Sequence, residues 1–368
     1  MLIHAATDNN IYPPLAGGTQ RAFGLYRGLA RQHEVAALCL VPNRTAAAAE
    51  ERVAGVRILR RKAWYTSLAW RLERARLGPM FLVTAGHTAA ARRLARAFGG
   101  PADALLADLH LTGLFAADPA PLKVYTAHNV EPDYFRTAAA AVAAPAFWRA
   151  RLQALEARAV ECADLTVVCS DEDAARMREL YGVGTRALAV VPNGYDETVV
   201  RPPEPEERAR ARSDLGLGER EYVALFVGSD VPHNRMALAG LVDRVLPPLA
   251  GEGIRLLVVG SVTRALAGRR EPWLIARPAT PDLAPLLHAA DAGLNPVTAG
   301  GGSNVKLPTY LAAGLAVITT AFGLRGFASL CPWVVTAGIG EMTEALRARP
   351  PGWRAQGLPA PPEVAEHA

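Results

Sequence analysis

The sequence lacks any apolar run that approaches the roughly 20 residues needed for a membrane-spanning helix. Its start lacks the positively charged segment and the small-residue cleavage site of a secretory signal peptide. Cysteine is also scarce: the four thiols share no metal-ligand spacing, and three of them lie in or beside apolar strand-like runs. These absences favour a cytoplasmic protein, and peripheral contact with the inner membrane face is the open alternative.

Charged residues make up only 20% of the 368 residues, against 51% hydrophobic ones. A chain of this length is expected to form two domains, each large enough to bury its own core. The formal net charge of +5 suits an anionic small molecule, nucleic acid or an anionic membrane surface. Because 35 acidic residues are interspersed with the basic ones, nucleic acid is the weakest of these partners.

Short β-branched or apolar runs alternate with helical segments in both halves of the chain, which predicts doubly wound parallel sheets. In the first half we expect strands at 2–7, 34–41, 56–61, 104–109, 123–128, 165–170 and 187–193. In the second half we expect them at 222–229, 254–261, 273–278, 292–297, 315–320 and 332–336. The expected fold is therefore α/β, with two Rossmann-like domains at 1–193 and 221–348, a linker with a surface helix at 194–220 and a Pro-rich tail at 349–368.

Small residues lie at the carboxyl ends of several predicted strands, where doubly wound sheets bind ligands. Gly228 and Ser229 end the first strand of the second half, and the loop after the first strand of the chain carries Gly17 and Gly18. Side chains this small let a ligand approach the backbone. We expect the two domains to face each other across a cleft that these loops line.

The loop from Gly300 to Lys306 combines three glycines with Ser303, Asn304 and one lysine, ahead of an apolar segment. Glycines let the loop expose its N–H groups, Ser303 or Asn304 can cap the following helix, and Pro308 is tolerated only near its first turn. Unpaired N–H donors, the positive end of the helix dipole and Lys306 together predict a site for a phosphate or diphosphate. The alternative is an ordinary glycine turn with a solvated lysine.

Six segments resemble glycosyltransferases of the GT-B fold, and among these the large retaining family 4. They are PPLAGGTQRAFGLYRGLA, YTAHNVE, ADLTVVCSDEDAARMRELYG, VVPNGYD, LFVGSDVPHNRMAL and ADAGLNPVTAGGGSNVKLPTYLAAGLAVITTAFGLRGF. Each motif is weak alone, whereas their shared order and spacing from about Leu2 to Phe327 make the resemblance specific.

The resemblance implies a nucleoside diphosphate sugar donor held mostly by the second domain. It implies transfer to an acceptor hydroxyl or amine with retained anomeric configuration. The residues that it implies in donor binding are Gly17, Gly18, Gly228, Ser229, Asn234, Arg235, Gly301, Gly302, Ser303, Asn304, Val305, Lys306 and Thr309. It implies a role at the reaction centre for His128 and, less directly, for Glu131. A buried structural histidine and a carboxylate at a helix start are the alternatives for these two.

The chain departs from the family at two positions. Family 4 usually carries two glutamates eight positions apart, and the second binds the ribose hydroxyls; here Gly301 and Thr309 occupy those places. A carboxylate on a vicinal diol makes charge-assisted hydrogen bonds, which threonine cannot. The donor could lack a hydroxyl there, as a thymidine diphosphate sugar does, or another residue could hold the ribose, or the protein could be a non-catalytic partner.

No cofactor and no divalent metal are expected, because Lys306, Arg235 and helix N-termini can stabilise the leaving diphosphate. A double displacement would need a carboxylate as its nucleophile, and Glu131 and Asp133 are the candidates near His128 in the sequence. We favour a route in which the leaving phosphate assists deprotonation of the acceptor. An auxiliary nucleotide-sugar-binding protein is the second hypothesis. A dinucleotide-dependent oxidoreductase ranks low, since no G-x-G-x-x-G fingerprint is present.

The segment 60–82 mixes Arg and Lys with Trp, Tyr, Leu and Phe. It could be a basic amphipathic helix on an anionic membrane, a wall of the acceptor site, or a helix packed on its own domain. The acceptor, whether lipid, glycan or another small molecule, is left open.

Overall fold

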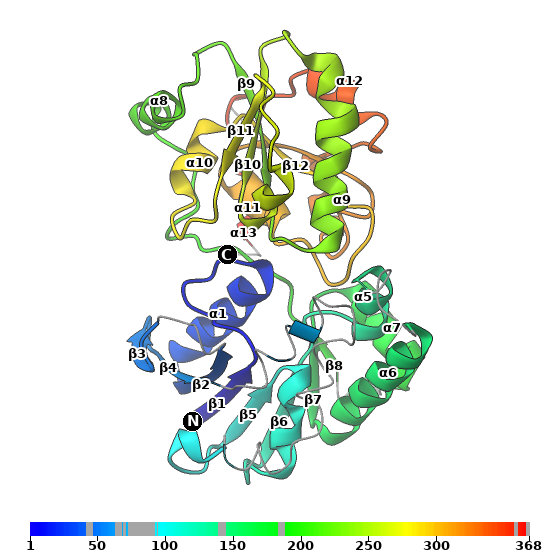
Figure 1. Ribbon diagram of the computed structural model, residues 1–368. Helices are drawn as coiled ribbons and strands as arrows, with labels where there is room; N and C mark the ends of the chain where they lie inside the picture. Colours follow the sequence, from blue (N-terminus) through cyan, green and yellow to red (C-terminus); the bar gives the residue numbers. More distant parts are fainter. Residues whose placement is uncertain are drawn as a thin grey trace. The chain divides into compact units, whose positions relative to one another are not determined.

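A computed structural model describes residues 1–41, 47–62, 95–138, 145–182, 188–356 and 360–365, together with Leu68, Arg71, Leu72 and Arg93. The chain divides into two units, each built around one sheet (Figure 1). The first comprises Met1–Pro14 and Gly18–Val191, and the second Leu15–Gly17 and Pro192–Ala368. Most of segment 60–82 lies outside the described residues.

The first unit contains an eight-stranded sheet in the order β3-β4-β2-β1-β5-β6-β7-β8. Its strands are β1 (Leu2–Thr7), β2 (Glu34–Val41), β3 (Glu50–Val53), β4 (Val56–Lys62), β5 (Ala104–Ala107), β6 (Leu122–Thr126), β7 (Leu165–Val168) and β8 (Leu188–Val190). All pairs are parallel except β3 with β4. The antiparallel edge strand β3 was missed because its charged sequence EERV has an alternating, exposed pattern.

Both faces of this sheet are buried, because successive side chains of a strand point to opposite faces. In β2, Leu38 and Leu40 belong to one apolar cluster while Cys39 and Val41 belong to another. The main helices of the unit are α1 (Gly17–Ala30), α5 (Glu131–Ala138), α6 (Pro145–Cys162) and α7 (Asp171–Tyr181). The switch in strand order falls between β1 and β5, where doubly wound sheets bind ligands.

The second unit contains a parallel six-stranded sheet in the order β11-β10-β9-β12-β13-β14. Its strands are β9 (Tyr222–Val227), β10 (Ile254–Val259), β11 (Leu274–Arg277), β12 (Ala292–Asn295), β13 (Ala316–Thr319) and β14 (Val335–Thr336). Its helices include α8 (Pro205–Asp214), α9 (Pro232–Gly240), α10 (Ala284–Ala289), α11 (Lys306–Ala312), α12 (Met342–Arg347) and α13 (Pro362–Ala365). The predicted α/β class, with two doubly wound sheets, is confirmed.

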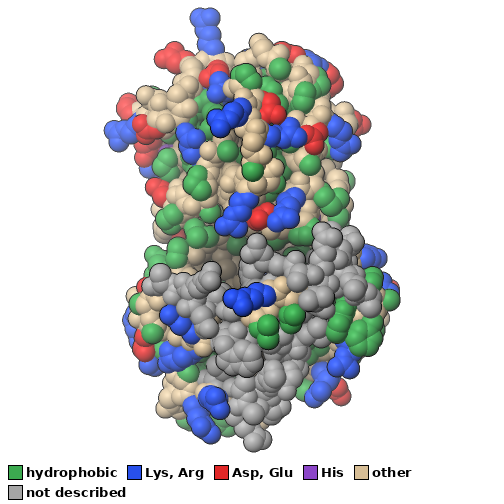
Figure 2. Space-filling model, viewed as in Figure 1, with side chains coloured by type: hydrophobic (Ala, Val, Ile, Leu, Met, Phe, Trp, Pro, Cys, Tyr) green, Lys and Arg blue, Asp and Glu red, His purple; other side chains and the backbone are tan. Residues whose placement is uncertain are grey.

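Helix α8 is docked on its unit and is more than the surface helix that its charged sequence suggested. Arg208 and Arg212 both reach the Asp291 carboxylate, and Arg212 also donates to the carbonyl of Ala289 in α10. Arg212 is buried, so its alkyl chain packs against the unit while both terminal nitrogens of its guanidinium donate hydrogen bonds. Elsewhere on the face seen in Figure 2, Lys and Arg side chains are interspersed with Asp and Glu.

No helix in the described ranges is both long enough and apolar enough to span a bilayer.

The position of α11 depends on a glycine in the neighbouring strand β12. A Cβ atom added at Gly293 would lie 2.1 Å from Cδ2 of Tyr310, which is fully buried. The Tyr310 hydroxyl in turn accepts a hydrogen bond of 3.0 Å from the Val227 N–H at the end of β9. Gly293 therefore lets α11 lie against the sheet, with its first residue beside the ends of β9 and β12.

We predict that Gly293→Ala destabilises the protein by about 1–3 kcal/mol, because Tyr310 cannot move without losing its bond to β9. Denaturant unfolding of the full chain measures this. Gly340→Ala is the control, since no atom lies within 4 Å of a Cβ there, and it should change stability by no more than about 0.5 kcal/mol. Equal effects of the two substitutions would contradict the packing that we describe.

Candidate functional site

Two loops of the second unit meet at the side chain of Lys306. One follows β9 and leads into α9; the other follows β12 and leads into α11. Since β9 and β12 are neighbours in a parallel sheet, their carboxyl ends lie side by side. Lys306 Nζ donates to Asn234 Oδ1 at 3.1 Å, and a Cβ at Gly300 would lie 3.5 Å from the His233 ring. The structure thus brings together the two loops that the sequence assigned to one ligand.

Lys306 has no anionic partner among the residues that the structure describes. Its Nζ lies 5.0 Å from the centroid of the Phe226 ring, and no carboxylate in the described part of the chain is within ion-pair distance. The side chain keeps partial exposure, yet protein atoms surround the ammonium closely enough for desolvation to lower its pKa to about 7. An ammonium held in this way would be stabilised by an anion bound beside it.

Asn234 orients this lysine from the first turn of α9. Its side chain is buried, and its amide donates to the Ser229 carbonyl at 3.0 Å while its oxygen accepts from Lys306. Gly228 makes room for it, because a Cβ at that position would lie 3.3 Å from Asn234 Cγ. Gly228, Ser229 and Asn234 therefore form one packed unit beside the ammonium.

Burial and the nearby charge of Lys306 together lower the pKa of His233 to about 4, so this ring is neutral at pH 7. Arg235, the other expected cation, is placed differently from Lys306. Its Nε bonds the Asp230 carboxylate at 2.6 Å, and more than half of its side chain is exposed. The charge of Arg235 is thus already balanced.

The glycine loop needs left-handed backbone at two positions, Gly300 (φ 140°) and Gly302 (φ 62°), with Gly301 between them. Gly17, which groups with this unit, lies beside the end of the loop: a Cβ there would be 3.6 Å from Val305 Cγ2. Gly18 belongs to the first unit, and no atom lies within 4 Å of a Cβ built on it.

The expectation that Ser303 or Asn304 caps α11 is wrong. The cap residue is Val305, with helical backbone and no side-chain bond to the helix. The Ser303 hydroxyl accepts from Asn193 Nδ2 at 2.8 Å instead, and Asn304 Nδ2 donates to the Gly323 carbonyl at 3.3 Å. Both side chains are thus used to hold the loop in place. Pro308 is the third residue of α11, within the first turn as predicted.

Thr309 is similarly engaged within its own helix. Its hydroxyl donates to the Val305 carbonyl at 2.9 Å, one turn earlier. The position where relatives carry a carboxylate therefore offers a ligand only the lone pairs of a hydroxyl whose proton is already committed.

A second cluster of polar side chains lies in the first unit, at the carboxyl ends of β1, β5 and β6. Asp8 and Asp108 follow β1 and β5, and each carboxylate binds a histidine: Asp8 binds His110 Nδ1 at 2.5 Å, and Asp108 binds His128 Nε2 at 3.1 Å. Asp108 also accepts from the Thr126 hydroxyl at 2.7 Å. Because β1, β5 and β6 are adjacent, these groups form one cluster.

The aspartates of this cluster raise the pKa values of both histidines. Burial lowers the pKa of His110, but the Asp8 carboxylate outweighs burial and raises the pKa to about 9. For His128, desolvation is likewise outweighed by Asp108, so its pKa lies above the ordinary value of 6.5. Burial raises the pKa of Glu131, against the opposing charges of His110 and His128.

Of this cluster, sequence reasoning named only His128 and Glu131. Asp8, Asp108 and His110 were missed, although each directly follows a predicted strand or lies in its last residues. Glu131 begins α5, and its N–H donates to Glu156 at 3.2 Å. Burial raises the pKa of Glu156 to about 8.

The family model described as Glycosyltransferase Family 4 matches residues 16–199, and the model described as Glycosyl transferases group 1 matches residues 221–347. The chain belongs to glycosyltransferase family 4.

Among curated relatives, a D-inositol 3-phosphate glycosyltransferase of Nocardia farcinica is 36% identical over 99 residues, which are 27% of this chain and 21% of that protein. The match therefore spans about a fifth of the relative's length. Among solved structures, sucrose-phosphate synthase of Thermosynechococcus elongatus has a TM-score of 0.70 at 16% identity, covering 95% of this chain and 89% of that one. HepE of Anabaena, in complex with UDP and glucose, has a TM-score of 0.62 at 13% identity, covering 95% and 89%. These structural matches show the GT-B fold.

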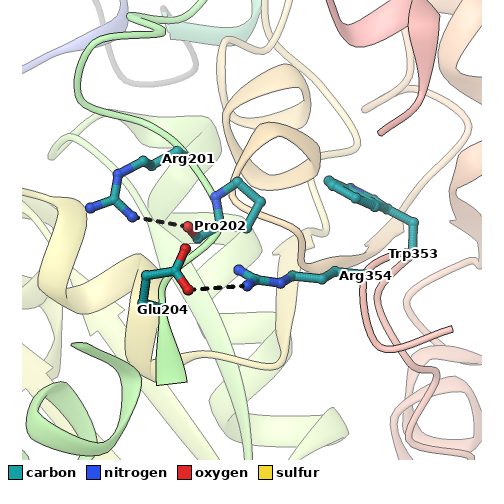
Figure 3. Close-up of a pocket in the computed structure, with 5 residues that line it drawn as sticks. All are labelled: Arg201, Pro202, Glu204, Trp353 and Arg354. Carbon is teal, nitrogen blue, oxygen red and sulfur yellow. Dashed lines mark hydrogen bonds and ion pairs between the residues drawn. The ribbon is translucent and has the colours of Figure 1, made fainter. Parts of the chain in front are cut away.

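This family 4 chain also carries a surface pocket of about 560 Å3 away from Lys306, lined by Arg201, Pro202, Glu204, Trp353 and Arg354 (Figure 3). It lies near the other end of α11, where the Trp353 indole donates to the Leu311 carbonyl at 2.7 Å. Both arginines face carboxylates: Arg201 binds Glu207, and Arg354 lies 4.0 Å from Glu204. The two arginines of this pocket are therefore less available to a bound anion than Lys306 is.

We predict that Lys306→Met stabilises the unliganded protein by about 1–2 kcal/mol at pH 6.5, because it removes a desolvated charge. Well below pH 7 the lysine is charged in the folded and unfolded states, so the whole desolvation cost is present. From about 7 up to the unfolded value of 10.5, the folded lysine loses its proton first, and the stability difference shrinks.

Urea unfolding at pH 6.5 and 9.5 measures both effects. The exposed Lys62 supplies the control substitution, Lys62→Met, which should change stability by no more than about 0.5 kcal/mol. A less stable Lys306→Met variant at pH 6.5 would show that the ammonium already has a partner.

Proposed function

We propose that this protein transfers a sugar from a nucleoside diphosphate sugar to a hydroxyl or amine of an acceptor. Transfer retains the anomeric configuration and needs no divalent metal. The observation that carries the proposal is Lys306, an ammonium without a carboxylate, between two glycine-containing loops at neighbouring strand ends. HepE, a protein of the same fold, is described with UDP and glucose bound, which supports a nucleotide-sugar donor here.

Lys306 suits the role of stabilising the leaving diphosphate. A cation in a desolvated position interacts more strongly with developing negative charge than one in water, and it needs no reorganisation during the reaction. Its bond to the buried Asn234 fixes Nζ in place. The ammonium thus provides electrostatic stabilisation of the kind that a metal ion provides in other phosphate chemistry.

The surroundings of Asp133 and Glu131 support a reaction in which the acceptor attacks from the same face of the sugar that the diphosphate leaves. Asp133 accepts two hydrogen bonds from Arg176, at 2.7 and 3.2 Å, so its oxygens are already engaged. Burial raises the pKa of Glu131, which favours its protonated and less nucleophilic form. A double displacement would need one of them as a nucleophile. We therefore favour a route in which the departing phosphate takes the proton of the acceptor.

Calorimetric titration of the full chain with UDP, GDP, ADP and dTDP, each with EDTA and with magnesium, tests the proposal. One diphosphate should bind in both buffers. Lys306→Met should weaken its binding about tenfold or more, as expected for a lost charge-assisted hydrogen bond. The matching nucleoside, which has no phosphate, should bind both proteins alike. Equal losses for diphosphate and nucleoside would refute the assignment of Lys306, and absence of binding by all four diphosphates would refute the donor class.

The side chain of Thr309 does not identify the nucleoside of the donor. We predict that Thr309→Glu strengthens binding of UDP or GDP about threefold or more, because a carboxylate can accept from both ribose hydroxyls. Thr309→Gln is the matched control, with the same length and no charge, and should give little gain. Equal affinities of the two variants would indicate that the ribose lies elsewhere.

A further inference from the structure

The pocket drawn in Figure 3 is formed by two segments that are far apart in the sequence. One wall, from the segment 201–204, precedes α8, and the other, residues 353–354, follows α12. Both walls belong to the second unit, and they meet beyond the last residue of α11, whereas Lys306 is the first residue of that helix. The pocket is therefore separate from the place that we assign to the diphosphate.

The end of α11 holds both walls in place. A Cβ atom added at Gly314, where φ is 81°, would lie 3.4 Å from Pro202 Cβ and 3.6 Å from Arg354 Cβ. A Cβ atom at Gly352 would lie 2.0 Å from the Gly314 carbonyl oxygen, so the second wall lies directly against the backbone that follows α11. Because this packing preforms the pocket, a ligand need not order its walls on binding.

The Trp353 indole offers the pocket ring carbons and no free polar group. Its Nε1–H donates to the Leu311 carbonyl at 2.7 Å, which uses the one donor that the side chain has. The side chain is only partly buried, and it lines the pocket together with the Pro202 ring. Two apolar rings of this kind favour a ligand that has C–H groups on its surface.

The charged side chains of the pocket are paired with one another and are exposed. Arg354 lies 4.0 Å from the Glu204 carboxylate, and Figure 3 shows its side chain reaching from beside Trp353 toward Glu204. Arg201 donates to both oxygens of Glu207, at 2.8 and 2.6 Å. Two arginines thus face two glutamates, which leaves little net attraction for an anion. A wholly apolar ligand would strip water from these charged groups at a cost in free energy.

A sugar meets both conditions. Each of its hydroxyls donates and accepts, so it can bond guanidinium and carboxylate groups at the same time. Its C–H groups can pack on the indole and proline rings, which are apolar. The volume of about 560 Å3 lies within the range of small-molecule sites.

We propose that this pocket binds a neutral sugar residue of a glycan, at a place that takes no part in the transfer reaction. The inference goes beyond the proposed function and does not depend on it, since it involves neither Lys306 nor a nucleotide. A glycan held in the pocket stays at a high local concentration beside the protein.

Saturation-transfer NMR of the full chain tests this with maltotriose, cellotriose, mannotriose and galactotriose as neutral probes, and it needs no variant. At least one of the probes should receive saturation, to the same extent with and without an excess of UDP or of inorganic phosphate. Displacement by UDP would place the sugar in the donor site, and displacement by phosphate would show an anion site. Either result, or no transfer to any of the probes, would overturn the inference.

Arg354→Gln should weaken binding of the sugar about fivefold or more, as expected when hydrogen bonds from a charged group are lost. Arg52→Gln is the matched control, because Arg52 is exposed in β3 of the first unit, and it should change the affinity less than about twofold. Both arginines lie on the surface, so both variants should fold. Equal affinities of the two variants would place the sugar elsewhere.

The indole N–H signal of Trp353, assigned from its loss in Trp353→Phe, gives a second readout in the wild type. Adding the sugar should shift this signal more than that of any other tryptophan, because the sugar packs on this ring. An unshifted Trp353 signal in the presence of bound sugar would contradict the inference. Failure of the proposed function is seen separately, as absence of diphosphate binding in calorimetry, which leaves the sugar titration unaffected.

Discussion

The second unit holds one positive charge, that of Lys306, for which the described residues supply no carboxylate. Lys306 reaches its place because Gly293 admits Tyr310 against β12, and because the Tyr310 hydroxyl ties α11 to the end of β9. Asn234 supplies a neutral oxygen where a carboxylate would have neutralised the site. Desolvating an ammonium without a nearby anion lowers the stability of the folded protein. Destabilising features of this kind are found mainly at functional sites, where a bound ligand can offset them.

The polar cluster of the first unit differs, because its carboxylates and histidines pair with each other. Asp8 pairs with His110 and Asp108 with His128, so hydrogen-bond donors and acceptors lie close together at the ends of three adjacent strands. A hydroxyl both donates and accepts, so an alternating set suits the hydroxyls of a sugar better than it suits a phosphate. Under the proposed function, the lysine of the second unit suits a diphosphate, whereas the histidine and aspartate pairs of the first unit suit hydroxyl groups.

Sequence pattern predicted the buried strands and the glycine loop at 300–302, because burial on both faces and left-handed turns select residue types directly. It placed Gly17 and Gly18 in a loop, whereas they begin helix α1. It failed where a side chain had several partners within reach. Ser303 and Asn304 are good cap residues, yet their bonds go to Asn193 and to the Gly323 carbonyl, far along the chain. The pairing of Asp108 with His128 was equally invisible, since it depends on β5 and β6 being neighbours. Local propensity cannot report such contacts.

The replacement at Thr309 bears on how the nucleoside is recognised. Its hydroxyl donates to Val305 within the helix, so α11 itself loses nothing by lacking the usual carboxylate. Lys306, three residues earlier, is desolvated and has no carboxylate partner among the described residues. Under the proposed function, a diphosphate bound beside this lysine would offset the cost of desolvating it. Binding would then depend more on the diphosphate than on contacts from Thr309 to the ribose.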